Sequence, residues 1–233
     1  MKSHYLGNDR LASLCRVGAI CAFVAGACYL AIVICAIMLP SSIASYVTSP
    51  QYFKDFASNK GLFMFLKALM MISNAAFVGV VIAFHALCRP VNFGKMTFFS
   101  ALAIIGLGVG VFQSVADMTM VPYLAEQYAL GSQVVKDVIV SLGVSNPSLY
   151  IVTLGFPGLW FILVSLMALN NPDIPKLLVA LGLLWGIGNI VTVIAHVMVM
   201  IWLIYMVALG ALCAAPIWSI WEGMFLWRLS KNL

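Results

Sequence analysis

Ionisable side chains are rare in the apolar segments of this sequence, and Lys67, Asp117 and His196 are the candidates for a ligand or ion-pair site. If one apolar helix begins near residue 61, Lys67 lies about 9 Å below its outer end, at about 1.5 Å of rise per residue. If the next helix ends near residue 122, Asp117 lies about 8 Å below the same surface. The matching depths predict an ion pair between Lys67 and Asp117, and His196, near the outer end of a later helix, can join it.

Three interpretations of this outer group stay open. Charged residues inside a membrane are costly and usually face a protein interior or a cavity. The group can therefore form an outward-facing polar pocket for a ligand or a proton, or an ion pair that only holds two helices together. Alternatively, the long side chain of Lys67 extends alone to the outer interface. A metal site at His196 would need two or three further ligands, so we predict no metal.

A second group of polar residues is expected near the centre of the membrane. It comprises Asn74, Gln113, Ser114 and Asn189. Amide hydrogen bonds between helices in lipid are worth about 1 kcal/mol each, so a structural role is the default interpretation. A binding site at the midplane is the alternative.

A third group is expected at the inner rim, where Glu222 precedes Arg228 near the end of the last apolar segment. Arg16, His85 and Arg89 end or begin neighbouring helices at a similar depth. We expect the Glu222 carboxylate to accept hydrogen bonds from one of these cations and to act as a structural lock.

Motifs of known chemistry are missing from the sequence. There is no HExxH, no GxSxG, no phosphate-binding loop and no pair of carboxylates within one apolar segment. Cys21, Cys28 and Cys35 repeat every seven residues, about 10 Å apart along a helix, which is too far for one metal or one disulfide. We therefore predict neither a cofactor nor a disulfide framework.

The composition places the chain in a membrane. Of its 233 residues, 64% are hydrophobic and 8% are charged, against about 45–50% and about 25% in soluble domains. The net charge of +5 is spread over too few cations to form a nucleic-acid-binding face, so we expect the lipid bilayer, and no nucleic acid, as a partner.

Runs of about 20 apolar residues predict an all-α bundle of six transmembrane helices that forms a single membrane domain over residues 1–233. The expected helices are 17–39, 61–87, 96–122, 147–169, 176–199 and 205–228. Small residues spaced by four mark the faces by which these helices pack. These are Gly18, Ala22 and Gly26, then Gly106 and Gly110, then Gly182 and Gly186.

The distribution of cations predicts the topology. Eight Lys and Arg residues fall on the side that holds both termini and three on the other side, and cationic loops stay in the cytoplasm. Both termini are therefore expected in the cytoplasm. On the outer side, Val134, Val135, Val138, Ile139 and Leu142 have helical spacing. They predict a short amphipathic helix that either rests on the outer membrane face or caps the mouth of the bundle.

Three long segments of the sequence resemble a widespread bacterial family of six-helix membrane proteins, classified as a domain of unknown function. They are FVGVVIAFHALCRPVNFGKMTFFSALAIIGLG at 77–108, PGLWFILVSLMALNNPDIPKLLVALGLLWGIGNI at 157–190 and IWEGMFLWRL at 220–229. The resemblance implies six helices and a bacterial plasma (inner) membrane. Glu222 is the one polar residue of this sequence that matches a polar position of the family pattern. The resemblance implies no activity, substrate or catalytic residue.

Three classes of function are compatible with these observations. The chain is most consistent with a non-enzymatic membrane protein that binds a lipid, a membrane partner subunit or a second copy of itself. The second class is a small-solute or proton-coupled transporter. The third is an enzyme acting on a lipid or a quinone, with His196 or His85 as a base.

Overall fold

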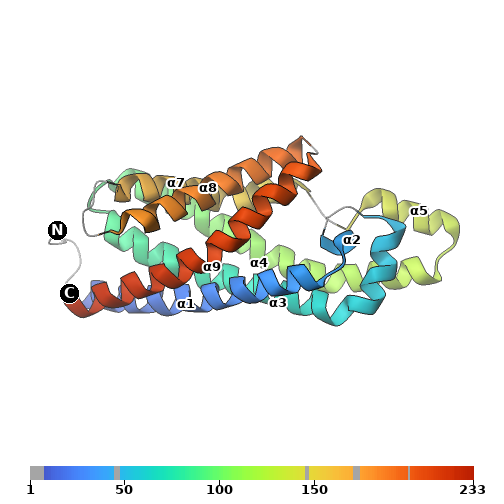
Figure 1. Ribbon diagram of the computed structural model, residues 1–233, viewed down its shortest axis with the longest axis horizontal. Helices are drawn as coiled ribbons and strands as arrows, with labels where there is room; N and C mark the ends of the chain where they lie inside the picture. The colour runs from blue at the N-terminus through green and yellow to red at the C-terminus, as the bar shows by residue number, and fades with distance from the viewer. Residues whose placement is uncertain (1–7, 45–47, 145–146, 170–173, 199) are drawn as a thin grey trace.

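The computed structural model describes residues 8–44, 48–144, 147–169, 174–198 and 200–233, and all of its regular elements are helices (Figure 1). The elements are α1 (Asn8–Met38), α2 (Ser41–Ala44), α3 (Pro50–Cys88), α4 (Phe93–Leu130), α5 (Gln133–Leu142), α6 (Pro147–Tyr150), the π-helical turn η1 (Ile151–Gly155), α7 (Phe156–Ala168), α8 (Lys176–Val197) and α9 (Ile201–Asn232).

Five helical segments of the described chain are long and apolar enough to cross a membrane. They are Asp9–Met38, Pro50–Cys88, Phe93–Leu130, Ile151–Ala168 and Lys176–Val197. Helix α9 is 32 residues long. The beginning of α1 and the end of α9 lie at the same end of the bundle (Figure 1).

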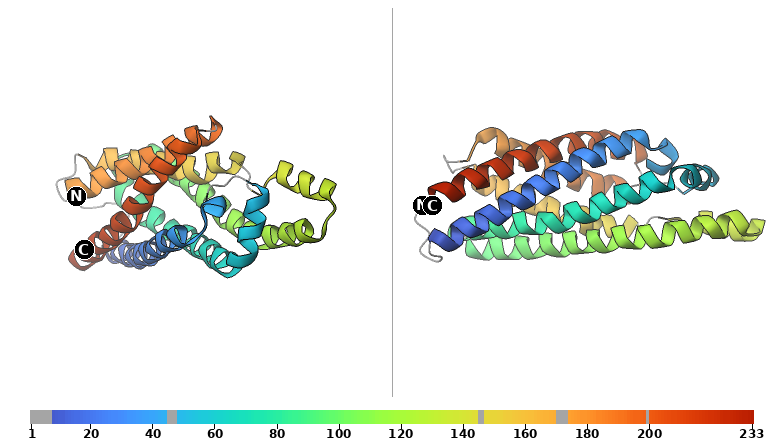
Figure 2. Two further views of the ribbon diagram at one scale, coloured as in Figure 1. Left: turned by 45° about the vertical axis from the view of Figure 1, so that its right-hand side comes forward. Right: turned by 90° about the horizontal axis from the view of Figure 1, so that it is seen from below.

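Six long helices close into a ring. Each packs against the next one along the chain, in the order α1, α3, α4, α7, α8 and α9, and α9 packs back against α1. Figure 2 shows α9, α1, α3 and α4 side by side as one layer, and α7 and α8 complete the ring behind it. A ring of this kind gives every helix an inward face, which is where polar side chains avoid lipid.

The small residues that predicted packing faces do lie at close contacts between helices. A Cβ atom on Gly18 would overlap with Ala83 Cβ, and one on Gly106 would lie 2.6 Å from the Val152 carbonyl oxygen. A Cβ on Gly182 would lie 2.5 Å from Ser165 Oγ. Because hydrogen is the only substituent that fits, these glycines set the distance between neighbouring helices.

Several helix ends differ from the expected ones. Helix α3 begins at Pro50 rather than near 61, because Ser49 caps it by accepting a hydrogen bond from the Tyr52 amide (3.2 Å). The expected start corresponds to a kink at Asn59, whose backbone is not helical (φ −119°, ψ 16°). Helix α4 continues through Pro122 to Leu130, since a single proline can bend a helix without ending it.

The last two long helices also differ from the expected boundaries. Helix α8 ends at Val197 and α9 begins at Ile201, earlier than the expected start at 205, and α9 extends beyond 228 to Asn232. The expected end of the fifth helix, residue 199, lies outside the described residues. Neither Gly nor Pro marks this turn, so the sequence contains no signal for its position.

The second half of α1, the first half of α3 and the end of α4 form a separate apolar cluster with α2 and α5, at the end of the bundle opposite to the termini (Figure 1). Ile139 of α5 is buried in this cluster, and the Val144 amide donates to Thr48 Oγ1 (2.8 Å), which joins the two outer connections. Val140 is partly buried against the same cluster, whereas Val134 and Leu142 are 72% and 78% exposed. The amphipathic helix is therefore present, and it packs onto the bundle end through Ile139 and Val140.

Candidate functional site

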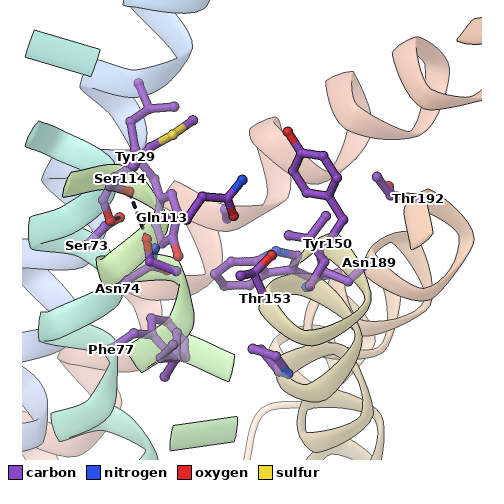
Figure 3. A pocket seen from close by; sticks show the side chains of 18 of the residues that line it. Tyr29, Ser73, Asn74, Phe77, Gln113, Ser114, Tyr150, Thr153, Asn189 and Thr192 are labelled. Atoms are coloured by element: carbon purple, nitrogen blue, oxygen red, sulfur yellow. Dashed lines mark hydrogen bonds between the residues drawn. The ribbon is translucent and has the colours of Figure 1, made fainter. Parts of the chain in front are cut away.

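A cavity of about 250 Å³ lies inside the helix ring, at the centre of the polar groups expected from the sequence (Figure 3). Its lining includes the whole expected outer group and the whole expected midplane group. The members are Lys67, Asp117, His196, Asn74, Gln113, Ser114 and Asn189. The sequence placed these residues in two layers by depth, and the structure brings both layers to one continuous surface.

The Lys67 ammonium and the Asp117 carboxylate form an ion pair with Nζ and Oδ2 2.6 Å apart. Their side chains are only 11% and 16% exposed, and the ammonium also lies 5.3 Å from the centre of the Phe63 ring. The expected ion pair is therefore present, and the alternative in which Lys67 extends alone to the membrane surface is wrong. The charges on this part of the cavity wall neutralise each other.

His196 lines the cavity from α8 but is oriented by its own helix. Its Nδ1 lies 2.8 Å from the Thr192 carbonyl oxygen, and its ring centre lies 4.4 Å from that of Tyr150. A carbonyl can only accept, so Nδ1 carries a hydrogen. The residues described here contain no group of three or more His, Cys, Asp or Glu side chains that could hold a metal ion.

Three side-chain amides face the cavity from different helices. Asn74 and Gln113 lie on the wall formed by α3 and α4, and Asn189 lies on the opposite wall formed by α8 (Figure 3). None of them hydrogen-bonds to another described residue, whereas the hydroxyls of Ser114 and Thr192 donate back to carbonyls of their own helices. Each amide offers both a donor and an acceptor. The free hydrogen-bonding capacity of the cavity therefore comes mainly from neutral groups.

The π-helical turn η1, which packs against α4, shapes part of the cavity wall. Thr153 and Leu154 of this turn line the cavity, and Pro157 follows in the first turn of α7. Proline lacks an amide hydrogen and disturbs the hydrogen bonds of the preceding turn, and π-helical turns are frequent at functional sites. Nothing in the sequence indicated that Thr153 would face a cavity.

Aromatic side chains border the cavity on the side of the chain termini. Phe77, Phe161 and Trp185 line the cavity and belong to a larger cluster with Trp160 and Trp218. The ring centres of Phe161 and Trp185 are 4.3 Å apart, and those of Phe161 and Trp218 are 5.0 Å apart. We call these five residues the aromatic cluster. The sequence did not predict this cluster. In the sequence of a membrane protein, aromatic residues that face the interior of the bundle cannot be distinguished from those that face lipid.

The expected inner-rim lock is wrong. Glu222 is fully buried, and neither of its carboxylate oxygens has a hydrogen-bond partner among the described residues. Arg16 and Arg228 are exposed, and the guanidinium of Arg89 lies 5.3 Å from the centre of the Phe93 ring. The sequence did not predict the direction in which each of these side chains points. Arg228 follows Glu222 by six residues, about 600° of helical turn, and so lies on another face.

The comparison with known families identifies the chain as a whole. Residues 24–228 match the family described as Domain of unknown function (DUF4386). The chain belongs to this family. The match covers α9 as far as Arg228, and thus all residues that line the cavity. No curated protein and no solved structure gives a match.

Proposed function

We propose that this DUF4386 protein is a non-enzymatic, multi-pass membrane protein whose internal cavity binds a small molecule. The observation that carries the proposal is the convergence of polar side chains from several helices on one cavity. Polar groups inside a membrane are expensive and are retained where they serve a site. A purely structural role would leave these amides hydrogen-bonded to each other, and they are not.

The proposed topology has six membrane-spanning helices and both termini in the cytoplasm of a bacterial cell, in the plasma membrane. In addition to the five apolar segments, α9 is long enough to span and closes the ring between α8 and α1. The helix ends nearest to the termini lie on one side of the bundle (Figure 1), as an even number of spans requires. The excess of cations on this side supports its cytoplasmic location.

The lining indicates the chemistry of the ligand. Neutral amides bind carbonyl, hydroxyl and amide groups, and aromatic walls favour apolar or flat ring surfaces. Because Lys67 and Asp117 neutralise each other at 2.6 Å, the cavity carries no excess charge on that wall. The ligand is therefore a small amphipathic molecule that is neutral, or a zwitterion that inserts between the paired charges.

Transport is the second candidate function, favoured by the aromatic cluster at one side of the cavity. The aromatic cluster borders the cavity on the side of the termini, and a carrier that works by alternating access needs its site to be closed toward one side of the membrane at a time. Proton or solute flux into liposomes that exceeds the flux into empty liposomes, and that disappears in Asp117→Asn, would favour transport. Flux equal to that of empty liposomes would leave binding alone.

Native mass spectrometry of protein extracted gently from its host membrane tests the binding proposal. We expect a bound molecule at one copy per chain, which is lost in Gln113→Leu, where the amide is replaced by an apolar group of similar size. Phe112→Leu is the matched control, because Phe112 is the neighbouring residue and is 68% exposed on the outside of the bundle. A bare wild-type chain, or equal loss in both variants, would contradict the proposal.

A further inference from the structure

A second polar site lies between α1, α3 and α9, away from the cavity. Glu222 and Ser219 are both fully buried on α9, and the two carboxylate oxygens and the hydroxyl oxygen have no hydrogen-bond partner among the described residues. The two residues are three positions apart, so their side chains are neighbours on one face of the helix. Three oxygen atoms without a partner are thus gathered at one buried place.

No positive side chain of the described residues neutralises Glu222. The titratable groups that face it are the thiols of Cys15 on α1 and Cys88 on α3. Arg16 and Arg228 point outward, and Arg89 lies over the Phe93 ring. On α8, the Lys176 ammonium donates to the Leu169 carbonyl instead.

His85 on α3 is also directed elsewhere, because its Nδ1 lies 3.4 Å from the Met96 carbonyl oxygen. A single negative charge buried without a counter-charge is strongly unfavourable. The counter-charge that the surrounding side chains do not supply must therefore come from solution.

We propose that Glu222 and Ser219 bind a monovalent cation, either a proton on the carboxyl group or a sodium ion held by the carboxylate and the hydroxyl. One carboxylate neutralises one positive charge, which favours a monovalent ion. A calcium ion needs six to eight oxygen ligands and magnesium six, more than this site provides. A proton or a sodium ion supplies the same charge, and the experiment distinguishes the two.

The proposed cation site is independent of the proposed ligand in the cavity. Trp218, which immediately precedes Ser219, belongs to the aromatic cluster, and its ring centre lies 5.6 Å from that of Trp185, a residue of the cavity wall. The cation site and the cavity thus lie on two sides of the same cluster. The site exists whether or not the cavity binds a ligand.

Infrared spectroscopy and thermal unfolding of the purified full-length protein at neutral pH test the proposal. One sample is kept in sodium-free buffer, and sodium chloride is then added against choline chloride at equal ionic strength. If the cation is a proton, wild type shows the carbonyl band of a protonated carboxylic acid, insensitive to sodium and absent from Glu222→Gln. If it is sodium, the band is absent in sodium, and Tm rises with sodium but not with choline, in wild type and not in Glu222→Gln.

Two further variants keep the result interpretable. Glu126→Gln removes an exposed carboxyl of α4 and must leave either signal unchanged. Ser219→Ala must shift the infrared band or weaken the effect of sodium, and it provides the test if Glu222→Gln does not fold. A wild-type protein with neither the band nor the sodium effect would overturn the proposal, since Glu222 would then be ionised and neutralised by the chain itself.

Discussion

Asp117 and Glu222 carry carboxyl groups within the apolar parts of α4 and α9, and the surroundings of these two groups are opposite. Asp117 on α4 borders the cavity and pairs with Lys67 at 2.6 Å. Glu222 on α9 is fully buried away from the cavity and has no hydrogen-bond partner among the described residues. The comparison shows that a charge in such a bundle can be balanced by the chain at one place and left to an external partner at another.

The helices are packed less tightly on the Asp117 side of the bundle than on the Glu222 side. On the cavity side, a Cβ atom on Gly110 would meet the amide tip of Asn74 at 2.7 Å, and this side chain has the cavity beside it. On the Glu222 side, a Cβ on Gly26 would lie 2.8 Å from Ile220 Cγ1 and 3.3 Å from both the Ile220 amide nitrogen and Ser219 Cβ. The Asp117 side therefore borders open space, and the Glu222 side is tightly packed.

The largest expected effect comes from Asp117→Asn. The substitution leaves the Lys67 ammonium nearly buried without a counter-charge, and breaking a buried ion pair from one side costs about 3–5 kcal/mol. Because the pair borders a cavity, we expect a loss near the lower limit, about 3 kcal/mol. Unfolding of the protein in mild detergent measures it, and a loss below about 0.5 kcal/mol would show that solvent already screens the pair.

The next effect tests the difference in packing. Gly26→Ala is expected to destabilise the protein by about 2 kcal/mol, within the range for overpacking, because backbone atoms of α9 cannot move aside. Gly110→Ala should change stability by less than about 1 kcal/mol, since the Asn74 amide can rotate into the cavity and alanine favours the helix. Equal losses in the two variants, measured by the same unfolding assay, would argue against a more open cavity side.

A smaller effect is the coupling between Lys67 and Asp117. In the double variant Lys67→Met and Asp117→Asn, no charge is left alone, so the combined loss of stability should be smaller than the sum of the single losses. We expect the difference to be about 1 kcal/mol or more, as for other residues in contact. Four unfolding curves complete the cycle, and strict additivity would mean that the two groups do not interact in the folded protein.

The smallest effect is expected for Glu222→Gln. The amide preserves the shape of the side chain and leaves no cation of the chain without its partner, so stability in sodium-free buffer should change by less than about 1 kcal/mol. This is the reverse of the Asp117→Asn result, although both variants remove a carboxylate from a long apolar helix. A loss of about 3 kcal/mol or more would restore the interpretation of Glu222 as half of a buried salt bridge.

The sequence predicted the ion pair between Lys67 and Asp117, but not the direction in which the cations near Glu222 point. Counting the rise along each helix placed Lys67 and Asp117 at one level, and they do form a pair. The same count placed Glu222 level with several cations, but their rotation around the helix axes points them outward or toward other groups. Rotation depends on which face packs against which neighbour, and one apolar sequence contains little information about that.

The helical fold was predictable because apolar length is a direct requirement of the bilayer. The convergence of the outer and midplane polar groups was not, since the positions of Thr153 and Trp185 on the cavity wall result from the π-helical turn and from the closure of the ring. The outer ends of α3 and α4 were also missed, because these turns pack on each other and on α5 rather than against lipid.

The most direct test of a ligand in the cavity is a photochemical crosslink in the intact membrane. A diazirine-bearing residue is introduced in place of Gln113, which lines the cavity, or in place of Phe112, which is 68% exposed on the outside of the bundle. After irradiation, mass spectrometry of the protein identifies what was captured. The account predicts one discrete small molecule at position 113 and a mixture of phospholipids at position 112. The same phospholipid mixture at both positions would contradict it.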